Sequence, residues 1–216
     1  MIAAIAGVAA ALAEMKPARI EHMILVDSPP TAGTTFTLMT RAYLTPVIGE
    51  ALSHFRSNAA IRRGLAQGFA PDFVVPEKFV ADLKQLTYPA FRTAHAESVA
   101  HRTQKPTYER LAEMKPTPRL LAIFGSRDAI VPPEAARYFE RVPGTRVAMI
   151  EGAGHSPIVE APARTLELID AFLKEPGAVT QPMGNAKGHR AVGQDGQDRK
   201  GPAGRRLLVS VLAAVR

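Results

Sequence analysis

Two loops near the carboxyl end of the chain carry side chains that can move protons. Asp128 follows an apolar run at 119–124, and His155 follows a second apolar run at 145–150. In a parallel sheet, the carboxyl ends of neighbouring strands meet at one edge, where functional loops gather. We therefore expect the Asp128 carboxylate to accept a hydrogen bond from the His155 imidazole, which fixes the tautomer of the ring and stabilises its protonated form. An acid followed by a histidine is the second half of a triad in the order nucleophile, acid, histidine.

The segments around these loops predict the strands and helices that position them. Residues 23–26 form a third short apolar run between turn residues, which predicts another strand, buried on both faces. Helical spacing at 133–141 and at 162–174 predicts helices that alternate with the strands, so the sheet should be parallel. An Ala-rich helix over 2–15 precedes the first strand.

The stretch between the first strand and the two loops, residues 36–115, has the periodicity of helices and contains no comparable apolar run. We therefore expect a mostly helical insert between two strands. Its predicted helices are 36–55, 59–69, 76–86, 89–101 and 107–114.

Composition places the chain among ordinary globular proteins. It has 216 residues, of which 46% are apolar and 22% charged, which suits one domain with a tail. The absence of cysteine excludes disulfides, thiolate catalysis and cysteine-based metal sites, and it is compatible with the reducing cytoplasm, where we expect the protein to reside. The apolar runs at the two ends of the sequence are too short to span a bilayer, so we expect no membrane association.

The positive charge is concentrated at the carboxyl end. Of the net charge of +7, residues 176–216 contribute +5, from seven Lys or Arg against Asp195 and Asp198. The remaining +2 is too small to mark a nucleic-acid-binding face on the body of the protein. Glycine, proline and scattered charges replace periodicity in this tail, which we expect to be disordered.

The strands and loops described above resemble motifs of the α/β-hydrolase fold family. The matching segments are RIEHMILVDS at 19–28, GSRDAIVP at 125–132 and GAGHSPIVEAP at 152–162. The similarity covers roughly residues 7–174. It implies a partial α/β-hydrolase fold: a parallel sheet with a helical cap inserted at 31–115 and a disordered basic tail at 176–216, the core being residues 1–30 and 116–175.

The resemblance also implies a reaction. Members of this family hydrolyse small, mostly apolar molecules through a covalent intermediate, without a metal ion or an organic cofactor. Here the bond would be an ester or a related bond, with His155 as general base and Asp128 as the acid that orients it. A small-molecule substrate is the expected partner. Apolar cap residues would line its pocket: Phe36, Leu38, Met39, Phe55 and Phe69.

The nucleophile of such a triad is missing from the sequence. In the family it precedes the helix that here spans 4–15, and counting back from Pro17 places it near Ala3 or Ala4, neither of which can attack a substrate. No Gly-x-Ser-x-Gly occurs in the chain. Three serines lie near the relevant edge of the sheet, but none follows a strand and opens a helix: Ser28, Ser126 and Ser156.

Two hypotheses account for this absence. In the first, the sequence is a truncated form of a working hydrolase whose nucleophile elbow is encoded upstream. In the second, it is a non-catalytic remnant of the family that acts as a binding or interaction protein. Without the first five strands of the family fold, the strand at 23–26 would have an unpaired edge, so we expect self-association through that edge.

Two further acids need an interpretation. Asp27 ends the strand at 23–26 and could replace Asp128 as the acid, but a role in the turn is the preferred reading. Glu160 is expected to cap or orient the final helix. The histidines outside the motif lack the spacing of metal ligands, and no metal, phosphate or dinucleotide motif is present.

Overall fold

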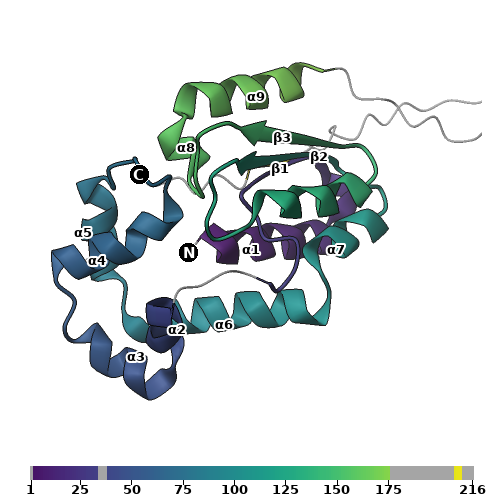
Figure 1. Ribbon diagram of the computed structural model, residues 1–216. Coiled ribbons are helices and arrows are strands. Elements are labelled where there is room, and N and C mark those ends of the chain that lie inside the picture. Colours follow the sequence, from purple (N-terminus) through teal and green to yellow (C-terminus); the bar gives the residue numbers. More distant parts are fainter. Residues whose placement is uncertain (1, 34–37, 176–206, 211–216) are drawn as a thin grey trace, which may run out of the picture.

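A parallel sheet forms the centre of the molecule in the computed structural model, which describes residues 2–33, 38–175 and 207–210 (Figure 1). Residues 2–6, 39–40 and 207–210 are described by their backbone alone. The sheet order is β3-β2-β1-β4. The strands are β1 (Ile20–Val26), β2 (Arg119–Gly125), β3 (Thr145–Ile150) and β4 (Leu207–Ser210). The predicted partial α/β-hydrolase architecture is therefore confirmed, with its three expected strands parallel and adjacent.

Alternation along β1 and β2 gives the sheet two apolar faces. Met23 and Leu25 belong to one core cluster, whereas Ile24 and Val26 belong to another, because successive side chains of a strand point to opposite faces. All four are at most 4% exposed. A strand that is covered on both faces has no polar side to show, which explains the continuous apolar run in the sequence.

Helices cover both faces of the sheet, above and below it in Figure 1. One face packs against α1 (Ile2–Met15), α7 (Thr107–Glu113) and η3 (Pro133–Arg141), a 3-10 helix. The other packs against α9 (Pro162–Lys174), through Leu168, Ile169 and Phe172. These three layers bury the central strands and hold the loops at their carboxyl ends in fixed positions.

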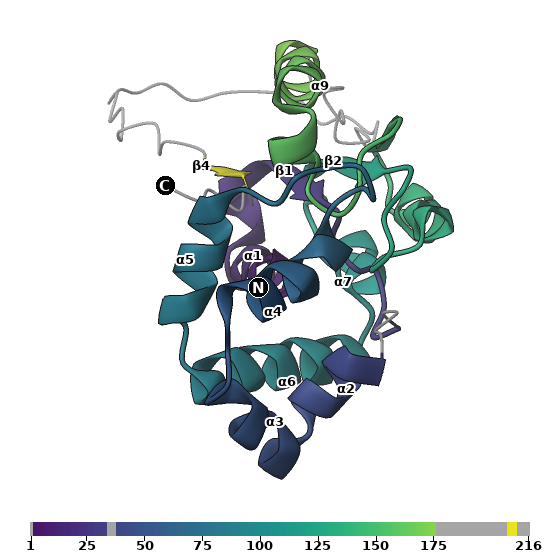
Figure 2. The same ribbon diagram turned by 60° about the vertical axis from the view of Figure 1, so that its left-hand side comes forward.

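The helices between β1 and α7, which we call the cap, form a group beside and below the sheet (Figures 1 and 2). The expected helix at 36–55 is instead two helices, because Pro46 lacks the backbone N–H of a helix interior and begins a new helix after Thr45. Residues 36 and 37 lie outside the described part. The cap elements are α2 (Leu38–Leu44), α3 (Pro46–Ser53), α4 (Asn58–Leu65), η2 (Ala66–Gly68), α5 (Glu77–Gln85) and α6 (Tyr88–Gln104).

The two connections between the cap and the sheet are tied together. The backbone N–H of Thr107 donates to the carbonyl of Pro30 at 2.8 Å, and Nε of Arg102 donates to the carbonyl of Thr31 at 3.0 Å. Burial of the Arg102 guanidinium lowers the pKa of this side chain. The segment after the second connection belongs to the core and not to the cap. Tyr108 and Leu111 of α7, which lie within the range predicted as cap, pack against one face of the sheet.

The outer edge of β1 is paired, contrary to the expectation of a free edge. Strand β4 runs parallel to it, with Met23 opposite Val209 and Ile24 opposite Ser210 (Figure 2). The prediction of disorder over 176–216 is wrong for 207–210, which form this strand; 176–206 and 211–216 lie outside the described residues. The reason is that Leu207, Leu208 and Val209 form a short apolar segment, which can satisfy the backbone groups of an exposed strand edge.

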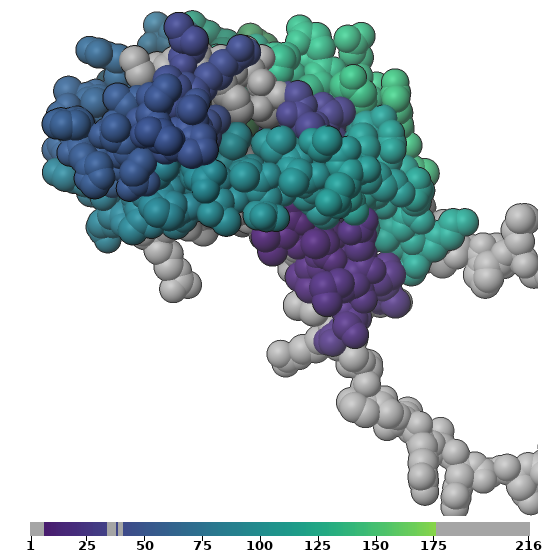
Figure 3. Space-filling view, turned by 90° about the horizontal axis from the view of Figure 1, so that it is seen from below, coloured from purple at the N-terminus to yellow at the C-terminus, as the bar shows by residue number. Residues whose placement is uncertain are grey.

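Helix α1 leaves apolar side chains on the surface. It packs against α6 and α7, yet Val8, Leu12 and Met15 are 69%, 44% and 72% exposed. Figure 3 shows this helix at the surface beside α6. Among the described helices, none combines the length and the hydropathy that a bilayer crossing requires.

Candidate active site

The loops after β2 and β3 meet at the carboxyl edge of the sheet. Gly125 and Ile150, the last residues of the two strands, are register partners. Beyond them, the N–H of Ser126 donates to the carbonyl of Ile150 at 3.0 Å, and the N–H of Arg127 donates to the carbonyl of Ala153 at 2.8 Å. These bonds continue the pairing of the strands into the loops, so the loops hold their side chains at a fixed separation.

Asp128 and His155 form a buried pair. Nδ1 of His155 lies 2.7 Å from Oδ2 of Asp128, and each residue is 6% exposed. The other carboxylate oxygen, Oδ1, accepts the backbone N–H groups of Ile130 at 2.7 Å and Val131 at 3.0 Å. Asp128 is thus held by its own turn while it orients the imidazole, which leaves Nε2 of His155 to exchange a proton.

Glu160 joins the cap to the histidine loop. It ends α8 (Pro157–Glu160), and its Oε2 accepts the N–H groups of Ala70 at 2.7 Å and Gly154 at 2.9 Å, while Oε1 accepts that of Ser156 at 3.0 Å. The expected role at the final helix is therefore wrong. A partly buried carboxylate with three amide donors fixes the backbone on both sides of His155 and anchors the cap beside it.

Close backbone approach explains two glycines of the motif. A Cβ atom on Gly125 would lie 2.0 Å from the carbonyl oxygen of Gly154, and one on Gly154 would lie 2.4 Å from the backbone nitrogen of Ala70. Gly152 has a φ of +81°, which L side chains rarely adopt. The loop that carries His155 is therefore packed directly against β2 and the cap, with no side chain between them.

Asp27, which the sequence reading assigned to a turn, lies in the same site. It is fully buried at the end of β1, and its Oδ1 accepts the N–H of Gly125 at 3.0 Å. Burial, and secondly the charge of Asp128, raise the pKa of this carboxyl well above its ordinary value. Its position after a strand adjacent to β2 was the signal in the sequence, because parallel neighbours end at the same edge.

The comparisons with known proteins agree with this geometry. Residues 3–168 match the family model described as the alpha/beta hydrolase family. The chain belongs to the alpha/beta hydrolase family. None of the curated proteins matches it significantly.

Solved structures of this family share the fold. The esterase of Thermogutta terrifontis is 21% identical with a TM-score of 0.58, and the meta-cleavage product hydrolase of Pseudomonas fluorescens IP01 is 19% identical with a TM-score of 0.57. Each alignment covers 78% of this chain and 61% of the other. The chain therefore spans about three fifths of the length of these hydrolases.

The position that the sequence predicts for the nucleophile lies at the beginning of α1. Ala3 and Ala4 lie in the first turn of that helix. The serines near the sheet edge have other contacts: Oγ of Ser28 donates to the carbonyl of Val26 at 3.4 Å, and Oγ of Ser126 accepts the N–H of Gly152 at 2.9 Å. Among the residues that the structure describes, no hydroxyl group is hydrogen-bonded to His155.

The five apolar residues expected to line the substrate pocket have different surroundings. Phe36, and the side chain of Met39, lie outside the described part. Leu38 and Phe55 are 84% and 83% exposed, and neither belongs to a core cluster of the described residues. Phe69 is buried in the cap core, stacked on Phe73, and its backbone lies against Gly154. Contact of these residues with a substrate stays a prediction.

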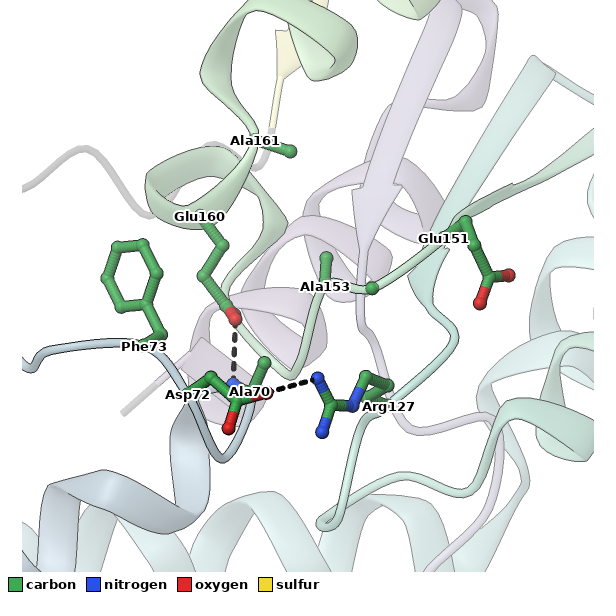
Figure 4. Close-up of a pocket in the computed structure, with 9 residues that line it drawn as sticks. Ala70, Asp72, Phe73, Arg127, Glu151, Ala153, Glu160 and Ala161 are labelled. Atoms are coloured by element: carbon green, nitrogen blue, oxygen red, sulfur yellow. Dashed lines mark hydrogen bonds and ion pairs between the residues drawn. The ribbon is translucent and has the colours of Figure 1, made fainter.

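A groove lies where the cap meets the loops of the sheet (Figure 4). Its volume is about 290 Å³. In the groove, the guanidinium group of Arg127 donates to Oδ2 of Asp72 at 2.8 Å, and beside it Oε2 of Glu160 accepts the backbone N–H of Ala70. The other lining residues are Phe73, Glu151, Gly152, Ala153 and Ala161. Since neither His155 nor Asp128 lines this charged groove, we do not take it as the place where an apolar substrate would react.

Proposed function

We propose that this chain supplies the general base and its orienting acid to the active site of a hydrolase that cleaves an ester or a related bond in a small, mostly apolar molecule. The observation that carries the proposal is the buried His155–Asp128 pair, 2.7 Å between Nδ1 and Oδ2. With Nδ1–H donating to the carboxylate, Nε2 is free of its proton and can accept one from a nucleophile.

The chemistry follows from that tautomer. The nucleophile attacks the carbonyl carbon of the substrate as its proton passes to Nε2, and the same proton then goes to the leaving alcohol. Water enters, loses a proton to Nε2 and attacks the covalent intermediate; the acid product then leaves as Nε2 returns that proton to the nucleophile. Asp128 stabilises the imidazolium in both steps and keeps its own negative charge, because two amide donors and the imidazole bind it.

The nucleophile of the proposed reaction comes from the part of the fold that the chain does not span. Support comes from two observations: positions 3 and 4 carry alanine, and about two fifths of each solved hydrolase lies outside its alignment with this chain. By itself, the 216-residue chain should show no ester hydrolysis that depends on His155.

The test uses the protein isolated from its source cells, with the intact mass recorded first. Hydrolysis of short-chain p-nitrophenyl esters is then compared between the natural protein and its His155→Ala, Asp128→Asn and His54→Ala variants. Loss of the base, or of the correct tautomer, should lower kcat by about 10³- to 10⁴-fold. His54 is exposed on the cap, where its Nε2 lies 3.8 Å from Oε1 of Glu50, so its variant should keep full activity. Equal activity in all four proteins would overturn the proposal.

A binding role without catalysis is the second candidate. It is favoured by the absence of a hydroxyl partner for His155 among the described residues. The two functions differ in their response to a fluorophosphonate, which labels an activated serine covalently. Labelling that disappears in His155→Ala supports the hydrolase, whereas an unlabelled natural protein of 216 residues supports the binding role.

A further inference from the structure

Asp27 is held against the His155–Asp128 pair by a strained backbone. It has a φ of +42°, and among the described residues other than glycine it alone has a positive φ. A left-handed conformation is unfavourable for an L residue, and among residues other than glycine Asp and Asn tolerate it best. At this position the side chain points inward from the end of β1: ligand atoms of Asp27, Asp128 and His155 all lie within 4.8 Å of one another.

The two carboxyl groups receive unequal numbers of donors. Asp128 accepts two amide N–H groups and faces the imidazole, so its negative charge is well compensated. Asp27 accepts one amide on Oδ1, and none of the described residues donates a hydrogen bond to its buried Oδ2. A buried carboxylate oxygen without a donor is costly, whereas a protonated one can itself donate. The geometry therefore accommodates one negative charge, on Asp128.

We propose that Asp27 carries a proton on Oδ2 and donates it in a hydrogen bond to the carboxylate of Asp128. Asp27 is then a positioning residue: its protonated carboxyl group donates to Asp128, which also faces His155, and the two carboxyl groups together carry a single negative charge. No bond breaks, and the proton stays on Asp27 through the catalytic cycle. The positioning role rests on the proposed function, whereas the protonation rests on the structure alone.

The charged groups around Asp27 act in the same direction. Asp128 from the loop after β2 and Glu160 from α8 both raise its pKa, after burial as the largest cause. His155, from the loop after β3, is engaged with Asp128 at 2.7 Å. A divalent cation is the other species that could offset two carboxylates, but Nδ1 of His155 and Oδ2 of Asp128 bond each other, and Oδ1 of Asp128 already has two donors.

Carboxyl spectroscopy of the intact chain tests the protonation. With ¹³C-labelled aspartate, one buried carboxyl should keep the chemical shift of a protonated acid at neutral pH, and the infrared band of a protonated carboxyl should accompany it. Both signals should vanish in Asp27→Asn. They should persist in Asp72→Asn, a matched change at an exposed aspartate. If every aspartate of the folded chain is ionised at neutral pH, the proposal is wrong.

The Asn variant is also the closest mimic of the protonated acid. Its amide oxygen can accept from Gly125, its NH₂ can donate to Asp128, and asparagine tolerates the left-handed backbone. Because the pKa of Asp27 is raised in the folded state, the folding equilibrium of the natural chain should weaken tenfold per pH unit above the ordinary carboxyl range, until the raised pKa is passed. Asp27→Asn should lack this slope. A difference between the two proteins that is constant with pH would overturn the proposal, and so would binding of one Zn²⁺ that depends on Asp27.

The positioning role has its own readout. The downfield Nδ1–H proton signal of His155 should remain in Asp27→Asn and disappear in Asp128→Asn. If Asp27→Asn does not fold, the spectra of the natural chain still decide the protonation. In the active protein from source cells, Asp27→Ala, which removes this donor to Asp128, should lower kcat, and Asp27→Asn, which keeps a donor, should recover most of the lost activity. Intact spectra with an inactive natural protein would refute the hydrolase but not the protonated Asp27.

Discussion

The two sides of the sheet differ in how far their polar and apolar groups find partners within the chain. On the side of β2 and β3, polar groups from two loops, α8 and the cap meet in a buried set of hydrogen bonds: Asp128 and Glu160 each accept two or more amides. On the side of α1 and β4, the described surface carries exposed apolar side chains such as Val8 and Met15. The polar groups of the first side find their partners within the chain, whereas α1 on the second side exposes these apolar side chains.

This difference separates two requirements of a hydrolase site. The acid and the histidine need only the strands that carry them and the segment that covers them, so these residues reach their geometry without the rest of the fold. A nucleophile elbow needs a strained strand–helix turn with amide groups beside it, and its strand lies beyond β1 in the family. The acid–histidine pair can therefore be assembled in a chain that spans only part of the fold.

The largest effect should come from filling the contact between the histidine loop and the cap. A methyl group on Gly154 would collide with the backbone of Phe69 and Ala70, so Gly154→Ala should lower the free energy of unfolding by about 3 kcal/mol. Gly64, exposed in α4 with open space around its Cα, is the matched control: Gly64→Ala should raise stability by up to about 1 kcal/mol. Urea unfolding measures both free energies. If Gly154→Ala leaves the free energy of unfolding unchanged, the cap and the loop are not in contact.

Removal of the carboxylate that joins cap and loop should cost somewhat less. Glu160→Ala leaves three amides without their acceptor, for which we expect a loss of about 2–3 kcal/mol. Hydrogen exchange should accelerate at Ala70, Gly154 and Ser156. Glu151→Ala, an exposed neighbour on the same loop, should change neither quantity. Unchanged exchange at Ala70 in Glu160→Ala would show that the cap is held to the loop by other contacts.

Much of the acid–histidine side could be predicted from the sequence because its signals are local. Each of Asp128 and His155 directly follows an apolar run, and parallel strands bring such positions together. Glu160 and Asp27 were read by their neighbours in sequence, as a helix cap and a turn. The amides that they bind, of Ala70 and Gly125, are 90 and 98 positions away. No local signal points from Glu160 to Ala70, whereas the position of Asp27 after a strand parallel to β2 does point to this edge of the sheet.

The other edge was misread for the same reason. The apolar segment at 207–210 follows a long stretch without periodicity. Disorder was predicted from the composition of the whole tail, in which these four residues have little weight. Its pairing with β1 depends on an edge that exists only in the folded sheet. The break between α2 and α3 at Pro46 could have been predicted from the sequence, because proline is strongly preferred in the first turn of a helix.

A change in β4 should alter association more than stability. Val209→Pro removes a backbone donor and cannot continue the ladder with β1, so we expect a loss of about 1 kcal/mol and a free edge on that strand. The freed edge should promote self-association, seen as a larger sedimentation coefficient that rises with concentration. Val209→Ala keeps the backbone donor and should sediment like the natural chain. If both variants sediment alike, the pairing of β4 does not protect the edge of β1.

The smallest effect on stability is expected on the exposed side of α1. Leu12 is 44% exposed whereas its neighbour Ala13 is fully buried in the core cluster with Met23. Leu12→Lys should change the free energy of unfolding of this chain by less than about 0.5 kcal/mol, because the ammonium group stays in solvent. In the protein from source cells the same Leu12→Lys is informative in a different way. If the segment that carries the nucleophile covers α1 there, the charge becomes buried and Leu12→Lys should destabilise that protein by several kcal/mol. Equal and small effects in both proteins would show that α1 stays exposed, and that the apolar side of this chain is not where the rest of a hydrolase packs.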